Sequence, residues 1–305
     1  MKSYFDYSCA TRIAGLIDEH YPFDGQKFAD AIAPQLPELE LKARVGVFAG
    51  QLRRQLPTDY PEALEVLRQS MGPELTEEKG MFSQMYYLMP FARFIEDYGL
   101  DYPEQSLAAI EHLTRRHTGE CAIRPYLHHH YELTMKHVHR CVHSPSEHVR
   151  RLASEGIRIY LPWASAFRRH EQHPESIVAV VEHLADDPAM FVRTSVANNL
   201  NDISKKHPEF AVRTAANWLS LRDTPRTRRV INKGLRTLIK NRNPDALDIV
   251  GASFDPNISV VSVQLEPDSL HIGDSATIQA DCAKHEENSV GTSPNTNSPS
   301  GRAHS

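Results

Sequence analysis

Three acidic residues, Glu120, Glu155 and Asp202, stand in or beside segments whose apolar residues recur with helical spacing. Helices with such spacing pack against one another, and burying a carboxylate there is costly unless it is paired. These residues are therefore candidates for chemistry. Each also has a plain structural explanation. Glu155 follows Arg151 by four residues, so the two can form a surface salt bridge, and Asp202 can be a polar helix end.

Aromatic and histidine residues give two further candidates. Trp163, in Leu161-Pro-Trp-Ala, stands at a proline-marked helix junction, where it either packs or presents its ring face to a cation or a sugar. Nine histidines lie between residues 112 and 148, but their spacing fits no metal site, three are consecutive, and no acidic ligand is suitably placed. Phosphate-loop, dinucleotide and serine-hydrolase motifs are absent. The sequence therefore predicts neither metal nor cofactor.

The charge distribution indicates which kind of partner the chain can bind. The chain has 305 residues with 34 basic against 39 acidic side chains, and its net charge of −5 alone argues against nucleic acid. Residues 205–242, however, hold 11 basic and 2 acidic residues, a net charge of +9. A solvated helix face is the ordinary explanation of such a run.

The four cysteines form no C-x-x-C pair, and neither a secretory signal nor a membrane span is visible, so we expect free thiols in a cytoplasmic protein.

Residues 1–255 predict an all-α fold with prolines at the helix boundaries. The segment 144–157, SPSEHVRRLASEGI, recurs 43 residues later as DPAMFVRTSVANNL, and TPRTRRVINKGL repeats the frame again from residue 224. Such periods indicate a HEAT-like solenoid of stacked helix pairs, with an irregular helical bundle as the alternative. Residues 256–282 alternate apolar and polar residues and predict two short strands. The polar residues 283–305 predict a disordered tail.

Several strings together resemble the AlkC-type DNA alkylation repair glycosylases, which are HEAT-like-repeat proteins related to the AlkD type. The strings are ECAIRPY from Glu120, EHVRRLASEG from Glu147, Leu-Pro-Trp from Leu161 and SVANNLNDISKKHP from Ser195, and the resemblance spans about residues 1–255. It implies excision of cationic N-alkylated bases, chiefly 3-methyladenine and 3-methylcytosine, from duplex DNA without conventional base flipping. It also implies base excision repair in the bacterial cytoplasm.

The resemblance assigns roles to the unusual residues. Glu120 and Glu155 match the family's pair of active-site glutamates, and Trp163 matches its tryptophan. Arg151 matches a family arginine, which we expect to contact DNA. Asp202 matches a further carboxylate residue of the family's site. Carboxylates would stabilise the oxocarbenium-like charge on the sugar and orient water. The +9 segment would supply phosphate contacts. The candidates for those contacts are Arg193, Arg228, Arg229, Lys233 and Arg236.

Two departures from the family pattern stand out. Family members tend to have Arg-Pro-Arg where this chain has Arg158-Ile-Tyr160, so a phosphate contact is lost or replaced by the Tyr160 hydroxyl. The strands at 256–282 look like the opening of the immunoglobulin-like domain of one family branch, yet such a domain needs about 100 residues. We therefore expect a remnant, by truncation or a shifted frame. The alternative to a monomeric enzyme is a non-catalytic HEAT-repeat nucleic-acid binder or scaffold; convergence of Glu120, Glu155 and Trp163 would distinguish the two.

Overall fold

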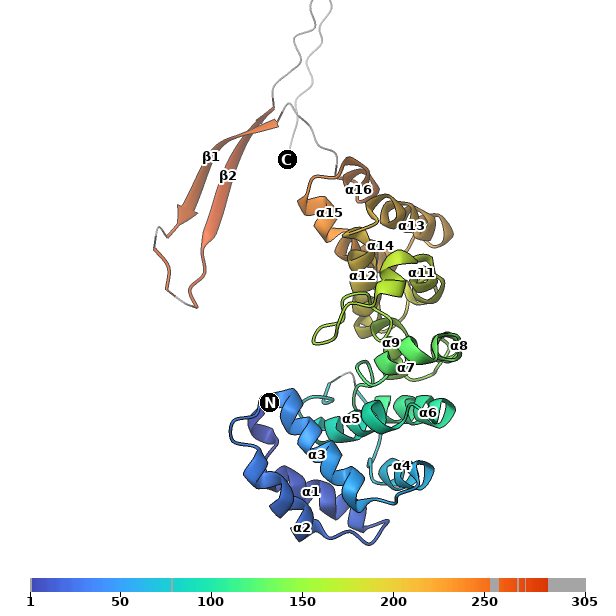
Figure 1. Cartoon of the computed structure of the whole chain (residues 1–305). Coiled ribbons are helices and arrows are strands. Elements are labelled where there is room, and N and C mark those ends of the chain that lie inside the picture. Colours follow the sequence, from blue (N-terminus) through green and yellow to red (C-terminus); the bar gives the residue numbers. More distant parts are fainter. Residues whose placement is uncertain (1, 78, 253–257, 268, 272, 285–305) are drawn as a thin grey trace, which may run out of the picture. The chain divides into compact units, whose positions relative to one another are not determined.

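The computed structural model describes residues 2–77, 79–252, 258–267, 269–271 and 273–284, and its contacts divide the chain after Gly251 into a helical unit and a short β unit (Figure 1). The helical unit begins with these elements: η1 Lys2–Tyr4, α1 Tyr7–Asp18, α2 Gly25–Ile32, η2 Ala33–Gln35, α3 Leu41–Gln55, α4 Tyr60–Gln69, η3 Tyr86–Leu88, α5 Met89–Tyr98, α6 Pro103–Thr114, α7 Arg124–His129 and α8 Tyr131–Cys141. It continues with α9 Glu147–Glu155, α10 Arg168–Gln172, α11 Glu175–Val181, η4 Glu182–Leu184, α12 Met190–Ser204, α13 Pro208–Leu221, α14 Pro225–Gly234, α15 Arg236–Lys240 and α16 Pro244–Ile249.

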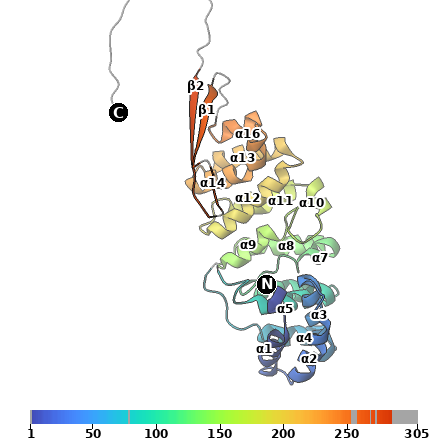
Figure 2. The same cartoon turned by 90° about the vertical axis from the view of Figure 1, so that its left-hand side faces the viewer.

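The predicted repeat forms the frame of the second half of this unit. The three recurring segments become α9, α12 and α14, and α12 packs directly against both of the others. The remaining helices follow in sequence order along the unit (Figures 1 and 2). Because each helix shares its apolar face with its neighbours, one buried core extends from Phe5 to Ala246. The predicted all-α, HEAT-like helical-repeat fold is confirmed.

Local signals explain where α14 and α16 begin. At α14 the Thr224 side chain accepts a hydrogen bond from the Thr227 backbone amide at 3.1 Å, and Pro225 occupies the first helical position. At α16 the Asn243 side chain caps the helix in the same way, ahead of Pro244. A side-chain cap satisfies an amide that the helix itself cannot, and proline is preorganised for the first turn.

The second unit is an antiparallel hairpin of β1 (Ile258–Glu266) and β2 (Thr277–Lys284), with an irregularity between Val260 and Ser262. From the Val260–Cys282 pair to the Glu266–Thr277 pair, the pairing separates the side chains by polarity, so that one face is apolar over this stretch. The apolar face carries Val260, Val263, Leu265, Ile278, Ala280 and Cys282. The opposite face carries Ser262, Gln264, Glu266, Thr277, Gln279 and Asp281. Both strands lie where strands were predicted, although β2 takes in residues 283 and 284, which were assigned to the tail. The rest of that tail lies outside the described residues.

In the part of the chain that the structure describes, no helix combines the length and the apolar character that crossing a membrane requires.

The contact between α12 and α14 depends on a glycine. A Cβ atom added at Gly234 would lie 2.6 Å from Leu200 Cδ2 and 2.9 Å from Leu200 Cβ. We expect Gly234→Ala to lower the free energy of unfolding by about 1–3 kcal/mol through overpacking, as measured by urea denaturation. Gly15→Ala in α1 is the control, because a Cβ there meets nothing within 4 Å. It should stabilise the protein by about 0.5–1 kcal/mol. Equal effects of the two changes would contradict close packing at Gly234.

Candidate active site

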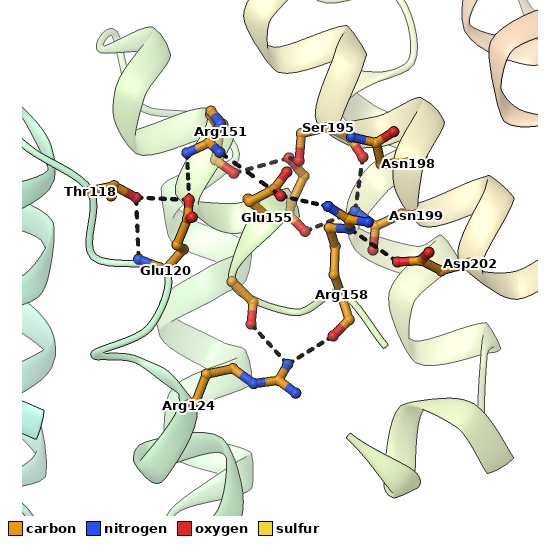
Figure 3. Close-up of polar contacts among 12 residues, drawn as sticks. Thr118, Glu120, Arg124, Arg151, Glu155, Arg158, Ser195, Asn198, Asn199 and Asp202 are labelled. Atoms are coloured by element: carbon orange, nitrogen blue, oxygen red, sulfur yellow. Dashed lines mark hydrogen bonds and ion pairs between the residues drawn. The ribbon is translucent and has the colours of Figure 1, made fainter. Parts of the chain in front are cut away.

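Three segments of the helical unit bring the predicted carboxylates together (Figure 3). Glu120 lies in the turn before α7, Glu155 is the last residue of α9, and Asp202 lies in α12. Small polar side chains allow α9 and α12 to approach closely: the Ser154 hydroxyl donates to Ser195 Oγ at 2.7 Å, and Asn199 Nδ2 donates to the Ser154 carbonyl at 2.8 Å. Polar side chains of α12 therefore form part of the contact between neighbouring repeats.

The carboxylates are joined by basic side chains into one continuous ladder, which we call the charge ladder. Arg151 Nη1 donates to Glu120 Oε2 at 2.7 Å, and Arg151 Nη2 lies 3.9 Å from Glu155 Oε1. Arg158 Nη1 then donates to Glu155 Oε1 at 2.7 Å, while Arg158 Nε donates to Asp202 Oδ2 at 3.0 Å. At the far end Lys205 Nζ donates to Asp202 Oδ1 at 3.2 Å.

Access to solvent differs along the charge ladder. The side chain of Glu120 is 16% exposed, that of Glu155 is 7% exposed and that of Asp202 is 1% exposed. A substrate can therefore reach Glu120 first, with Glu155 behind it and Asp202 fully enclosed. Thr118 supports the outermost carboxylate, because its hydroxyl donates to Glu120 Oε2 at 2.8 Å.

The surroundings of Glu155 keep it ionised. Burial acts most strongly and by itself would raise its pKa. The charges of Arg151 and Arg158, together with hydrogen bonds from Ser195 and Arg158, outweigh that effect and hold the pKa of Glu155 below its usual value. The site therefore maintains a carboxylate, rather than a carboxylic acid, in a nearly dry position. Such a group can stabilise positive charge but is unsuited to protonating a leaving group.

Two arginines of the site were missed as site residues by sequence reasoning. Arg158 was noted only as a departure from the family pattern, although its spacing of three residues from Glu155 is a usable signal. Arg124 lies inside a quoted string but was given no role. Its buried guanidinium donates to the carbonyls of Gly156, Arg158 and Ser165 at 3.3, 2.8 and 2.9 Å. Arg124 thereby connects the end of α9 to the loop that carries Trp163.

Trp163 occupies a strained turn beside Glu120. Its φ angle is +69°, in a turn closed by the Ala164 amide donating to the Leu161 carbonyl. A position of this kind normally favours glycine. The Lys42 ammonium donates to the Trp163 carbonyl, and the indole is 66% exposed. Trp163 and Glu120 line the same cavity, whose volume is about 680 Å³. Backbone strain together with an exposed aromatic ring suits a functional position better than a packing role.

Comparisons with known proteins match the chain as a whole. No protein-family model matches the chain. A curated relative, described as "Uncharacterized protein YhaZ" of Bacillus subtilis (strain 168), is 32% identical over 277 residues, which is 90% of this chain and 74% of the relative. The solved structure of Pseudomonas fluorescens alkylpurine DNA glycosylase AlkC, bound to DNA containing an abasic site analog, is 27% identical with a TM-score of 0.78, covering 93% of this chain and 87% of that one.

The chain belongs to the AlkC-type DNA glycosylase family. Its fold is that of an AlkC-type DNA glycosylase.

Two helices, α14 and α15, carry four of the basic residues that we expected to contact DNA in this AlkC-type fold. Arg228, Arg229 and Lys233 line one hollow on α14 with Asn232. Arg236, on α15, reaches toward α12 and donates to Asn198 Oδ1 at 3.4 Å. The hollow on α14, which we call the α14 surface, carries the positive charge that phosphate contacts require.

Arg193 and Tyr160 lie differently from what the sequence suggested. Arg193 is buried, and its guanidinium donates to the carbonyls of Asp187 and Pro188 before α12. That guanidinium fixes a turn and is not part of the α14 surface. The Tyr160 hydroxyl donates to Glu171 Oε1 at 2.6 Å, so its hydrogen is engaged within the protein.

One group of side chains resembles a metal site in this AlkC-type glycosylase. The ligand atoms of Glu111, His137 and Cys141 lie within 4.8 Å of one another, so an acidic residue does accompany one histidine, contrary to the sequence argument. Two cations already occupy the surroundings: Arg140 donates to His137 Nδ1 at 2.8 Å, and Arg115 donates to Glu111 at 3.2 Å. A divalent ion would meet both charges, so the residues fit an internal polar cluster better than a metal centre.

The charge ladder predicts a pH-dependent effect of removing Arg158. Arg158→Met keeps an unbranched stem but leaves Glu155 and Asp202 without this partner, so we expect the free energy of unfolding at pH 7 to fall by about 3–5 kcal/mol. In the native protein the lowered pKa of Glu155 contributes stability that is present above the usual value of 4.5 and is lost as the pH falls. Without Arg158, burial should raise this pKa, so the deficit should shrink as the pH falls from 7 toward 4.5.

Urea unfolding at several pH values measures this deficit. Arg168→Met is the control, because Arg168 is 81% exposed and pairs with Glu171 at 2.9 Å. Its loss should cost less than about 1 kcal/mol. A deficit for Arg158→Met that is as small as this control would show that the ladder does not support the fold.

Proposed function

We propose that the chain hydrolyses the N-glycosidic bond of cationic N-alkylated bases in duplex DNA, chiefly 3-methyladenine and 3-methylcytosine, without conventional base flipping. The observation that carries the proposal is the charge ladder, whose most accessible carboxylate, Glu120, lines a cavity with the exposed ring of Trp163. The base class and the retention of the lesion in the duplex come from the family resemblance.

The chemistry needs stabilisation of positive charge more than proton donation. When the bond between C1′ and the base nitrogen breaks, its electron pair leaves with the base, so a cationic base departs as a neutral molecule. The sugar acquires the positive charge in an oxocarbenium-like state. Water then adds at C1′, and its proton passes to a carboxylate oxygen or to solvent. No general acid is required, which suits a site that holds Glu155 ionised.

The geometry suggests how the residues divide this work. Glu120 would face the sugar and the attacking water. Glu155 would add negative potential from behind through Arg151, and Asp202 would hold Arg158 in place. The exposed Trp163 ring would contact the developing cation with its face. Arg151, which bridges the two glutamates, would position Glu120 in addition to facing DNA.

We propose that the second unit provides an additional contact with DNA. A hairpin with one largely apolar face suits the opening strands of a two-sheet sandwich, so we propose residues 256–282 as the first strands of an immunoglobulin-like domain that follows a glycosylase domain at 1–255. A monomeric enzyme acting on chromosomal DNA in the cytoplasm completes the proposal.

A non-catalytic HEAT-repeat scaffold is the competing function. Such a protein has no use for carboxylates that must be desolvated and then neutralised by arginines. The contact of Glu120 and Glu155 with the same guanidinium, and the cavity shared by Glu120 and Trp163, support the enzyme.

Replacing Glu155 tests the catalytic assignment. Glu155→Gln keeps the shape and can still accept a hydrogen bond from Arg158, but it removes the negative charge. We expect release of 3-methyladenine from alkylated duplex DNA to fall roughly 10²- to 10³-fold, while DNA affinity stays nearly unchanged. Glu175→Gln, at a 64% exposed position in α11, should retain full activity. Retained excision by Glu155→Gln would refute the assignment.

The α14 surface predicts a salt dependence. Each phosphate contact contributes about one unit to the slope of log affinity against log salt. Lys233→Ala and Arg229→Ala should each reduce that slope by about one unit, as measured by fluorescence anisotropy with duplex DNA. Arg54→Ala in the last turn of α3 is the control outside the basic segment. An unchanged slope for both variants would place the DNA elsewhere.

A further inference from the structure

The cavity beside Glu120 extends well beyond the charge ladder. Its volume of about 680 Å³ lies within the range of sites that hold whole small molecules. Its wall is built from α3, α5, the turn before α7, α7 itself and the Trp163 turn. Of the three ladder carboxylates, only Glu120 lines it. Most of this wall is therefore unexplained by bond cleavage.

Two aromatic rings are exposed on this wall. Phe82, from the segment before η3, is 43% exposed, and Trp163 is 66% exposed. Packing does not account for them, because burying either ring would stabilise the fold. Phe82 is held through its neighbours, since the Met81 carbonyl contacts His117 Nδ1 at 2.8 Å and the rings of Phe82 and His117 meet edge to face. Exposed rings on a supported wall suit contact with a planar ligand.

The wall also carries the carboxylate of Glu96. Among the described residues Glu96 of α5 has no ion-pair partner, although Arg93 of the same helix pairs with Asp97 at 2.7 Å. The Lys42 ammonium, also on the wall, is engaged by the Trp163 carbonyl. Burial raises the pKa of Glu96 most strongly; the charges of Arg93 and Lys42 oppose this effect, and the charge of Asp97 adds to it. A partly desolvated carboxylate gains from a ligand that donates hydrogen bonds to it.

We propose that this cavity binds the released base as a free planar amino-heterocycle, with Glu96 accepting hydrogen bonds from its amino group and the rings of Phe82 and Trp163 contacting it. The inference rests on the proposed function for the identity of the base. An amino group is the feature that 3-methyladenine and 3-methylcytosine share, and carboxylates recognise such groups on nucleobases. The cavity would separate the departed base from the reactive sugar, so that recombination competes less with the addition of water.

Direct binding of the free base tests this site without any bond cleavage. The chain has two tryptophans, and Trp218 is buried in α13 and does not line the cavity. A saturable change in tryptophan emission on adding free 3-methyladenine would therefore report on Trp163. We expect a dissociation constant between micromolar and millimolar, given the small size of the ligand. 1-Methylthymine presents a carbonyl where adenine presents its amino group, and it should bind at least about tenfold more weakly.

Matched variants locate the site. Glu96→Gln should weaken binding of 3-methyladenine by about tenfold, as measured by calorimetry, because it removes a charged acceptor. Phe82→Leu should also weaken it by several fold. Glu209→Gln, at an exposed position in α13, should leave the affinity unchanged. Unchanged affinity in both cavity variants, or equal binding of 1-methylthymine, would overturn the inference.

The outcomes separate this inference from the proposed function. Binding of the free base by a protein that releases no base from alkylated DNA would refute the proposed excision and leave the cavity assignment standing. Excision without any detectable binding of the free base would refute the cavity assignment and leave the proposed excision standing.

Discussion

The bridging of Glu155 and Asp202 by one buried guanidinium is the interaction on which the rest of the site depends. Neither carboxylate could be kept out of water alone, because the desolvation cost would neutralise it or unfold its surroundings. Arg158 satisfies both at once, and it does so across the boundary between α9 and α12. The helices must therefore keep one separation and one register, which the hydrogen bonds of Ser154 with Ser195 and Asn199 also maintain. The geometry of the proposed site and the stacking of the repeats are thus the same constraint.

Much of the fold could be predicted from the sequence because its signals are local. Helical spacing, prolines at helix starts and a repeated Pro-then-Val-Arg frame do not depend on distant contacts, and they indicated α9, α12 and α14. The site was only partly predictable. The pairing of Glu155 with Arg151 follows from spacing on a helix, and the sequence alone allowed it to be a surface bridge. The prediction that Glu155 and Glu120 belong to one site rested on the family resemblance and not on spacing.

What could not be predicted depends on environment rather than position. Arg193 and Arg228 occupy equivalent places in the repeat, yet Arg193 is enclosed by the turn at Asp187, whereas Arg228 is exposed and pairs with Asp223. Arg124 and Arg158 are buried, which few arginines are, and their roles follow from carbonyls and carboxylates contributed by distant segments. The strained φ of Trp163 is likewise invisible in Leu-Pro-Trp-Ala, since proline there is compatible with several turns.

The charge ladder also has a consequence at longer range. Its three carboxylates are matched by Arg151, Arg158 and Lys205, so the group as a whole is electrically neutral. An unmatched cluster of three negative charges would repel the phosphates of any duplex brought close enough to react, within the roughly 8–10 Å over which surface fields persist. Neutrality removes that repulsion. Lys205 itself belongs to the +9 segment, so ten of the eleven basic side chains of that segment remain outside the ladder. A polyanion can then approach the carboxylates that we propose as catalytic groups without meeting an unbalanced negative charge.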